Sequence, residues 1–215
     1  MFKTILRSAA AATLLLAAPA AQALTFDFTG QSRLSAPTIS TSAGGITLDA
    51  SGRRCATTGC ATGSDANIQR WGNGLGLKAF YREQHTFDGW GPNEMAILTF
   101  GTTVELQALD FHYVEDTRDQ FSLWTRGDAG WTQITQALTI GKTANGAGRF
   151  SFADAIRGRV FGVATTDTDD AWKFRGATAD LAAPDLVSPV PLPAGVLLLI
   201  GGLGTLVALR RGARS

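Results

Sequence analysis

The chain has 215 residues, of which 45% are hydrophobic, and its 19 Lys and Arg residues nearly balance its 18 Asp and Glu residues. Five of the basic residues and none of the acidic ones lie in residues 1–23 and 194–215, so the middle carries 14 basic against 18 acidic residues. A mildly acidic, mixed surface argues against nucleic acid and anionic lipid as partners. The length of this middle fits one domain with a sizeable core.

Residues 1–23 have the pattern of a secretory signal peptide. Lys3 and Arg7 precede a short apolar stretch, and Ala21-Gln22-Ala23 is a small-x-small cleavage pattern. The alternative is a permanent N-terminal helix, but the run is too short and Pro19 interrupts it. We therefore expect export of the chain, with cleavage after Ala23.

Residues 24–184 alternate short apolar runs with turn residues and predict one β-domain. Residues 24–30 and 45–51 alternate apolar and polar side chains, as half-buried strands do. Residues 50–78 are poor in apolar residues and rich in Gly and Thr, which predicts a long loop. The sequence therefore predicts strands on both sides of one extended surface segment.

The predicted loop contains both cysteines of the chain, Cys55 and Cys60. An exported protein meets an oxidising compartment, so this pair predicts one disulfide. Closing so small a loop removes about 2 kcal/mol of unfolded-state entropy. The alternative is a redox or metal pair, but the spacing is C-x4-C and only two histidines remain as other soft ligands.

The segment "HTFDGWGPNE" at 85–94 is the densest polar cluster of the chain. Its carboxylate and amide oxygens suit a hard cation such as Ca²⁺, and an aromatic ring in a loop suits a sugar. Apart from that Ca²⁺, we expect no cofactor and no metal. The alternative is a structural turn built on its Asp-Gly and Gly-Pro-Asn steps. The candidate ligand-binding residues here are His85, Asp88, Trp90, Asn93 and Glu94.

Two strands are predicted next. Residues 94–101 are evenly apolar, as in a strand covered on both faces. In residues 104–114 the apolar phase changes near Ala108, which predicts a β-bulge. With the runs that follow, we expect eight or nine strands in an antiparallel, jelly-roll-like β-sandwich. Residues 153–157 are the one candidate helix.

The later strands carry three tryptophans of interest. Trp124 alternates with Phe121 and Leu123, so we expect it to point outward and to be a sixth candidate for binding a sugar. We expect Trp131 and Trp172 in the core. The acidic run 167–170 lacks the Gly and distal Glu of an EF-hand loop, which favours a solvated hairpin tip over a metal site.

A linker at 185–193 includes the start of a proline motif. From that motif onward, the chain ends in three elements in fixed order. Val190-Pro191-Leu192-Pro193-Ala194 comes first, then the apolar segment 194–209, then a basic tail at 210–215 with Arg210 and Arg211. As a helix the apolar segment is about 24 Å long, a marginal span for a hydrocarbon core of about 30 Å. The positive-inside rule predicts that the arginines stay cytoplasmic.

These three elements resemble the PEP-CTERM sorting signal in its VPLPA form. The resemblance implies that an exosortase, a membrane-embedded cysteine protease, is a partner and cuts near the proline motif. It also implies export across the inner membrane of a Gram-negative bacterium, a transient membrane anchor, and then a place at the cell surface or in the extracellular matrix. The alternative is a plain tail anchor.

Residues 72–181 are also similar to the extracellular β-sandwich ectodomains that often precede this tail. No nucleophile-elbow motif occurs, and we assign no catalytic residue. The sequence therefore predicts a non-enzymatic surface or matrix protein that binds exopolysaccharide weakly. The alternative is a secreted polysaccharide hydrolase or lyase that uses acids such as Asp88 or Glu94.

Overall fold

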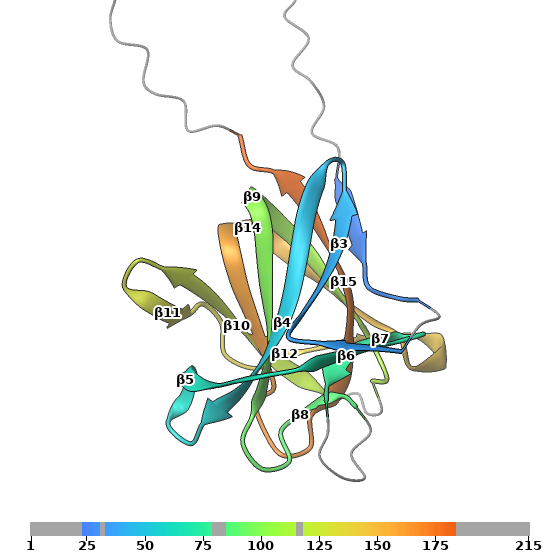
Figure 1. The fold of residues 1–215 in the computed structure, drawn as a ribbon, viewed down its shortest axis with the longest axis vertical. Helices are drawn as coiled ribbons and strands as arrows, with labels where there is room; N and C mark the ends of the chain where they lie inside the picture. The colour runs from blue at the N-terminus through green and yellow to red at the C-terminus, as the bar shows by residue number, and fades with distance from the viewer. Residues whose placement is uncertain (1–22, 31–32, 79–84, 115–117, 184–215) are drawn as a thin grey trace, which may run out of the picture. The chain divides into compact units, whose positions relative to one another are not determined.

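The computed structural model describes residues 23–30, 33–78, 85–114 and 118–183, and these form an antiparallel all-β fold without an α-helix (Figure 1). The predicted all-β, antiparallel class of the domain is therefore confirmed. The described residues contain 15 strands rather than eight or nine, because several strands of two to four residues are too short to show alternation. The strands are β1 (Leu24–Asp27), β2 (Leu34–Ala36), β3 (Thr38–Ala43), β4 (Ile46–Ala56), β5 (Gly59–Ala66), β6 (Ile68–Trp71), β7 (Gly74–Leu77), β8 (Phe87–Asp88), β9 (Glu94–His112), β10 (Gln120–Gly127), β11 (Gly130–Gln133), β12 (Leu138–Thr139), β13 (Gly141–Lys142), β14 (Gly148–Ala164) and β15 (Ala171–Leu181), with one 3-10 turn, η1 (Ala144–Gly146).

Two long strands, β9 and β14, connect the two layers of the sandwich. They pair with each other along most of their 19 and 17 residues. The first half of β9 also pairs with β4, whereas its second half pairs with β15. The register between β9 and β14 shifts where Thr99 pairs with Val160 and Val104 pairs with Gly158, so the sheet bends there. One continuous hydrogen-bonded sheet therefore supplies both layers.

The alternation of apolar residues in β9 explains how it serves two apolar clusters. Ala96, Leu98 and Phe100 enter the main core, while Met95 and Ile97 enter a smaller cluster on the opposite face. The prediction of a strand covered on both faces is confirmed. The predicted bulge is confirmed at Gln107, which lies between residues paired with the adjacent Thr178 and Ala179 of β15.

Two local predictions were wrong. Residues 50–78 form most of β4 and the strands β5, β6 and β7 instead of a loop. Their buried positions are partly Ala, Gly and Cys, and polar side chains cover the outer face, so hydropathy alone does not show the alternation. The candidate helix at 153–157 is part of β14, where Ile156 pairs with Leu106.

The predicted disulfide between Cys55 and Cys60 is confirmed, and it closes the turn between β4 and β5. The compact unit that holds the sheet extends to Leu181. Within the described ranges no helix is long and apolar enough to cross a membrane. The signal peptide, the segment 194–209 and the sorting motif with Arg210 and Arg211 lie outside the described residues, so their assignments stay predictions.

Candidate functional site

The outer face of the β4–β9–β14–β10 layer carries the candidate site. Two hairpins, β4–β5 and β10–β11, extend on the same side of the molecule, and β11 contacts β5 (Figure 1). The smaller apolar cluster lies beneath them, with Trp124 and Trp131 packed against it. Gly162 makes room for Trp131, since a Cβ there would lie 3.1 Å from the indole. The absence of a side chain at Gly162 therefore lets the Trp131 indole pack directly on this face of the sheet.

The first cavity on this face, which we call the amide cleft, has a volume of about 380 Å³. Gln133 lies directly across from Trp124 in the β10–β11 ladder, and paired residues share a face. The cleft is rich in amide and hydroxyl groups and has one large aromatic side chain. It is lined by Thr58, Gly59, Cys60, Asn93, Ser122, Trp124, Gln133, Gln136, Ala137, Thr165 and Thr166.

Hydrogen bonds hold the polar groups of the amide cleft in place. The Trp124 indole N–H donates to Ser122 Oγ at 3.0 Å. Gln133 Nε2 donates to the Thr135 carbonyl at 3.0 Å, and Asn93 Nδ2 donates to the Thr166 carbonyl at 3.4 Å. Each amide thereby keeps a defined direction while its oxygen and second N–H stay able to bond a ligand.

A second cavity on the same face, the arginine cleft, has a volume of about 600 Å³. The guanidinium carbons of Arg53 and Arg126 lie 5.7 Å and 5.8 Å from the centroid of the Trp131 ring. Asp65 Oδ1 lies 3.8 Å from a terminal nitrogen of Arg53. The sequence analysis did not single out Arg53, Asp65 or Arg126, because they come from three strands and no local motif joins them.

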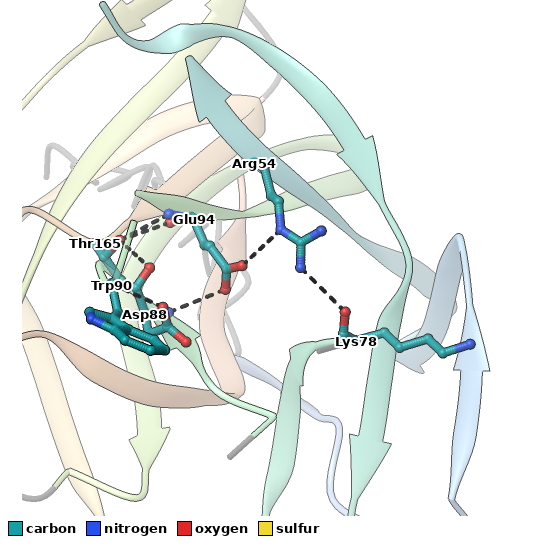
Figure 2. A network of polar contacts seen from close by, with 6 residues as sticks. All are labelled: Arg54, Lys78, Asp88, Trp90, Glu94 and Thr165. Carbon is teal, nitrogen blue, oxygen red and sulfur yellow. Dashed lines mark hydrogen bonds and ion pairs between the residues drawn. The ribbon is translucent and has the colours of Figure 1, made fainter. Parts of the chain in front are cut away.

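Glu94 lies at the centre of a polar network between β4, β8 and the end of β14 (Figure 2). Its Oε1 accepts from Arg54 Nε, and its Oε2 accepts from the backbone N–H of Asp88, both at 3.3 Å. Its own backbone N–H donates to Thr165 Oγ1 at 3.0 Å, and that hydroxyl donates to the Asp88 carbonyl. The carboxyl group of Glu94, which lies on β9, therefore links this strand to β4 and β8 through hydrogen bonds.

Burial controls the protonation of this carboxyl group. Desolvation, followed by the charge of nearby Asp88, raises the pKa of Glu94 from 4.5 to about 8, against the opposing effects of the Asp88 N–H and of Arg54. Glu94 is 4% exposed, whereas the Arg54 side chain is 27% exposed. Water therefore screens the arginine more than the acid, and the neutral carboxylic acid is the main form at neutral pH.

Asp88 and Trp90 behave as the turn interpretation expects. Asp88 Oδ1 accepts from the Trp90 backbone N–H at 3.0 Å, which is an Asx turn. Gly91 follows with a φ of 97°, a backbone conformation that favours glycine. The Trp90 side chain is 75% exposed, so its ring is accessible to a ligand from solvent.

His85 belongs to a different cluster from the other five candidates. Its ring stacks on Trp71 with centroids 4.8 Å apart. Buried Lys173 lies 5.3 Å from the same indole and 5.5 Å from the Tyr113 ring, and its Nζ donates to Asn73 Oδ1 at 3.0 Å. Burial lowers the pKa of Lys173. Residues 71 and 173 come from distant strands, so no sequence signal links them.

The acidic run 167–170 was only partly predicted. Asp167 and Asp169 are exposed, as expected for a hairpin tip, but Asp170 is 1% exposed. Its Oδ2 accepts from Thr166 N, Thr166 Oγ1 and Asp167 N, and its Oδ1 accepts from Gln120 N. Asp170 thus organises the turn from within. Within the described ranges no group of three or more His, Cys, Asp or Glu residues could hold a metal ion.

Two of the three tryptophans lie where the sequence predicted them, and the third does not. Trp124 is half-buried on the outer face, opposite the buried Phe121 and Leu123, as its alternation predicted. Trp172 is fully buried in the core, and its indole N–H donates to the Gln120 carbonyl. Trp131 is not in the main core: it packs on the smaller cluster, because β11 is an edge strand that folds over the sheet face.

No protein-family model and no curated protein matches the chain. Among solved structures, discoidin II from Dictyostelium discoideum is 9% identical over 50% of this chain, with a TM-score of 0.34, and the match spans 47% of its own length. A family 32 carbohydrate-binding module from C. perfringens NanJ, in complex with galactose, is 7% identical over 61% of this chain and 93% of its own, with a TM-score of 0.36. CpGH89CBM32-5 from Clostridium perfringens, in complex with GalNAc-β-1,3-galactose, is 10% identical over 63% and 95%, with a TM-score of 0.33. TM-scores this low do not establish a common fold.

Proposed function

We propose that the chain is an exported surface or matrix protein whose jelly-roll-like β-sandwich binds extracellular polysaccharide weakly and does not cleave it. The amide cleft is the observation that carries this proposal. Sugar hydroxyls both donate and accept hydrogen bonds, and so do the amides of Asn93, Gln133 and Gln136 that line the cleft. Trp124 offers an apolar ring on which sugar rings pack, and the bond from its N–H to Ser122 Oγ holds that ring in place.

The arrangement of these groups favours a weak, selective contact with sugar. Asn93 and Gln133 are oriented by bonds to backbone carbonyls, which lowers the entropy lost when a ligand binds. The cleft volume of about 380 Å³ is at the small end of ligand pockets. Exposed Trp90 lies three residues before Asn93 in the chain and offers a second aromatic ring to a sugar chain.

Loss of the aromatic ring or of an amide should weaken retention by the producer's own exopolysaccharide. With Trp124→Ala or Trp90→Ala we expect retention on an affinity gel to fall about 2- to 12-fold, because ring stacking contributes about 0.5–1.5 kcal/mol. Gln136→Ala should act in the same direction. The matched control is Gln69→Ala, which removes the same amide from β6. Equal retention of all four variants would contradict binding in the amide cleft.

The competing function is a hydrolase or lyase that uses Asp88 or Glu94. Both carboxyl oxygens of Glu94 accept hydrogen bonds from protein groups, and Asp88 holds a turn, so the geometry favours structural roles for them. The gel experiment separates the two functions. Steady release of reducing ends or unsaturated sugars that Asp88→Asn or Glu94→Gln abolishes would establish the enzyme. Loss of binding on addition of a chelator would instead indicate Ca²⁺.

We further propose that an exosortase processes the C-terminal tail of the exported chain. The order of proline motif, apolar segment and arginines supports this proposal. Changing Pro191 and Pro193 to Ala, or Arg210 and Arg211 to Glu, should leave unprocessed precursor in the inner membrane, detected by immunoblot of membrane fractions. Normal release of both variants, with their tails removed, would count against exosortase sorting.

A further inference from the structure

Two arginines that line the arginine cleft, Arg53 and Arg126, lie close to one aromatic ring, that of Trp131. Arg53 lies on β4 and Arg126 on β10, and the guanidinium carbon of each lies less than 6 Å from the centroid of the Trp131 ring on β11. Each cation is attracted to the ring, but the two cations repel each other. A group of negative charge bound in the cleft would relieve that repulsion, since both arginines line it.

Arg53 also has an unused hydrogen-bond donor. Its side chain is only 15% exposed, and its Nε is buried without an acceptor among the described residues. A buried donor without a partner costs about 1–3 kcal/mol, so such groups are uncommon unless water or a ligand bonds them. The one ion pair of Arg53 among the described residues is the 3.8 Å contact with Asp65, whose side chain is 90% exposed and therefore mobile in water.

The charge of the cleft differs from that of the domain. Two basic residues and one acidic residue line the cleft, which gives it a net positive charge. The middle segment of the chain as a whole is net negative, with 14 basic against 18 acidic residues. Ile97 and Val160 add an apolar floor next to the arginines. An apolar floor with guanidinium forks on its rim suits a ring that carries a planar carboxylate, which arginine binds through two parallel hydrogen bonds.

We infer that the arginine cleft binds the carboxylate-bearing sugar of an acidic polysaccharide, a uronic acid, and so selects charged glycans over neutral ones. This inference rests on the proposed carbohydrate binding and names its preferred class of ligand. Arg53 and Arg126 hold the carboxylate, and the apolar floor contacts the sugar ring. Asp65 opposes binding, because its own carboxylate competes for Arg53 and repels the anion.

The test compares two polymers that differ only in charge: sodium alginate and the same alginate after chemical reduction of its carboxyl groups. The full chain is run in a mild detergent through affinity gels of each polymer, with chelator present to exclude a Ca²⁺ bridge. We expect about tenfold stronger retention by alginate. Arg126→Gln should lose about that tenfold on alginate and change nothing on the reduced polymer. Asp65→Asn should strengthen retention on alginate.

Both variants lie on exposed side chains, so they should fold normally. Lys142→Gln removes one exposed positive charge on β13, outside the cleft, and controls for net charge. Equal retention by the two polymers, or a loss with Lys142→Gln as large as with Arg126→Gln, would overturn the inference. Stronger, Arg126-dependent retention by dextran sulfate than by alginate would overturn the carboxylate assignment. If Trp124→Ala still weakens retention by the reduced polymer, the proposed function survives that failure. No retention by either polymer overturns the inference alone, because the gel of the producer's own exopolysaccharide tests the proposed function separately.

Discussion

Asp170→Ala should lower the free energy of unfolding by at least about 3 kcal/mol, although the residue lies in an acidic stretch that looks solvated from sequence. Its carboxylate accepts four hydrogen bonds, from three backbone N–H groups and one hydroxyl, and it is 1% exposed. Truncation leaves these donors without an acceptor in a site with little water. It also releases the start of β10 from the β14–β15 turn.

Urea unfolding followed by circular dichroism measures this effect. Asp169→Ala is the matched control, since it removes an exposed carboxylate one residue away and should change stability by less than about 0.5 kcal/mol. Asp170→Asn keeps the shape of the side chain but replaces one acceptor oxygen by an N–H₂ group, so its loss should fall between the two. Equal effects of Asp169→Ala and Asp170→Ala would show that the carboxylate of Asp170 does not organise the turn.

The second large effect concerns pH. The pKa of Glu94 is about 8 in the folded protein and near its ordinary 4.5 when the chain unfolds. Between these values the folded state holds a proton that the unfolded state has released, so raising the pH favours unfolding. The stability that Glu94 contributes is complete below a pH of about 4.5 and is lost as the pH rises through about 8. The loss should be on the order of a few kcal/mol.

Glu94→Gln isolates this titration, because glutamine has nearly the shape of the protonated acid and keeps an oxygen that can accept from Arg54 Nε. We expect the variant to show a flatter stability profile between a pH of about 5 and about 8, measured by urea unfolding at several pH values. If the wild-type protein loses no more stability than Glu94→Gln over this interval, Glu94 does not carry a raised pKa.

Local patterns predicted the parts of the fold that depend on one strand at a time. The two-sided strand around Leu98 and the bulge at Gln107 follow from the order of apolar residues alone. Residues 50–78 escaped prediction because small residues such as Ala50 and Gly52 occupy the buried positions there. Hydropathy does not distinguish a small buried residue from a turn residue, whereas the pairing of β4 with β9 does.

Some residues of the candidate site were likewise predicted from local sequence patterns, whereas others come together only in the folded structure. Alternation placed Trp124 on the outer face, and turn chemistry drew attention to Asn93, and the structure brings both to one cleft. Gln133 on the edge strand β11 and Gln136 in the connection to β12 lacked any signal, because polar residues are common at both kinds of position. The approach of both Arg53 and Arg126 to the Trp131 ring depends on two hairpins that meet in space, which the order of residues along the chain does not show.

The pairing of β1 with β15 has a consequence for the timing of folding. Residues 24–27 lie beside residues 176–179, so the first strand has no partner until almost the whole domain has been made. At ribosomal speeds of about 5–20 residues per second, that wait is on the order of ten seconds. During this time the hydrogen-bonding groups of β1 have no strand partner among the described residues. Under the proposed export, the position of β15 as the last strand would delay completion of the sheet until nearly the whole domain has been made.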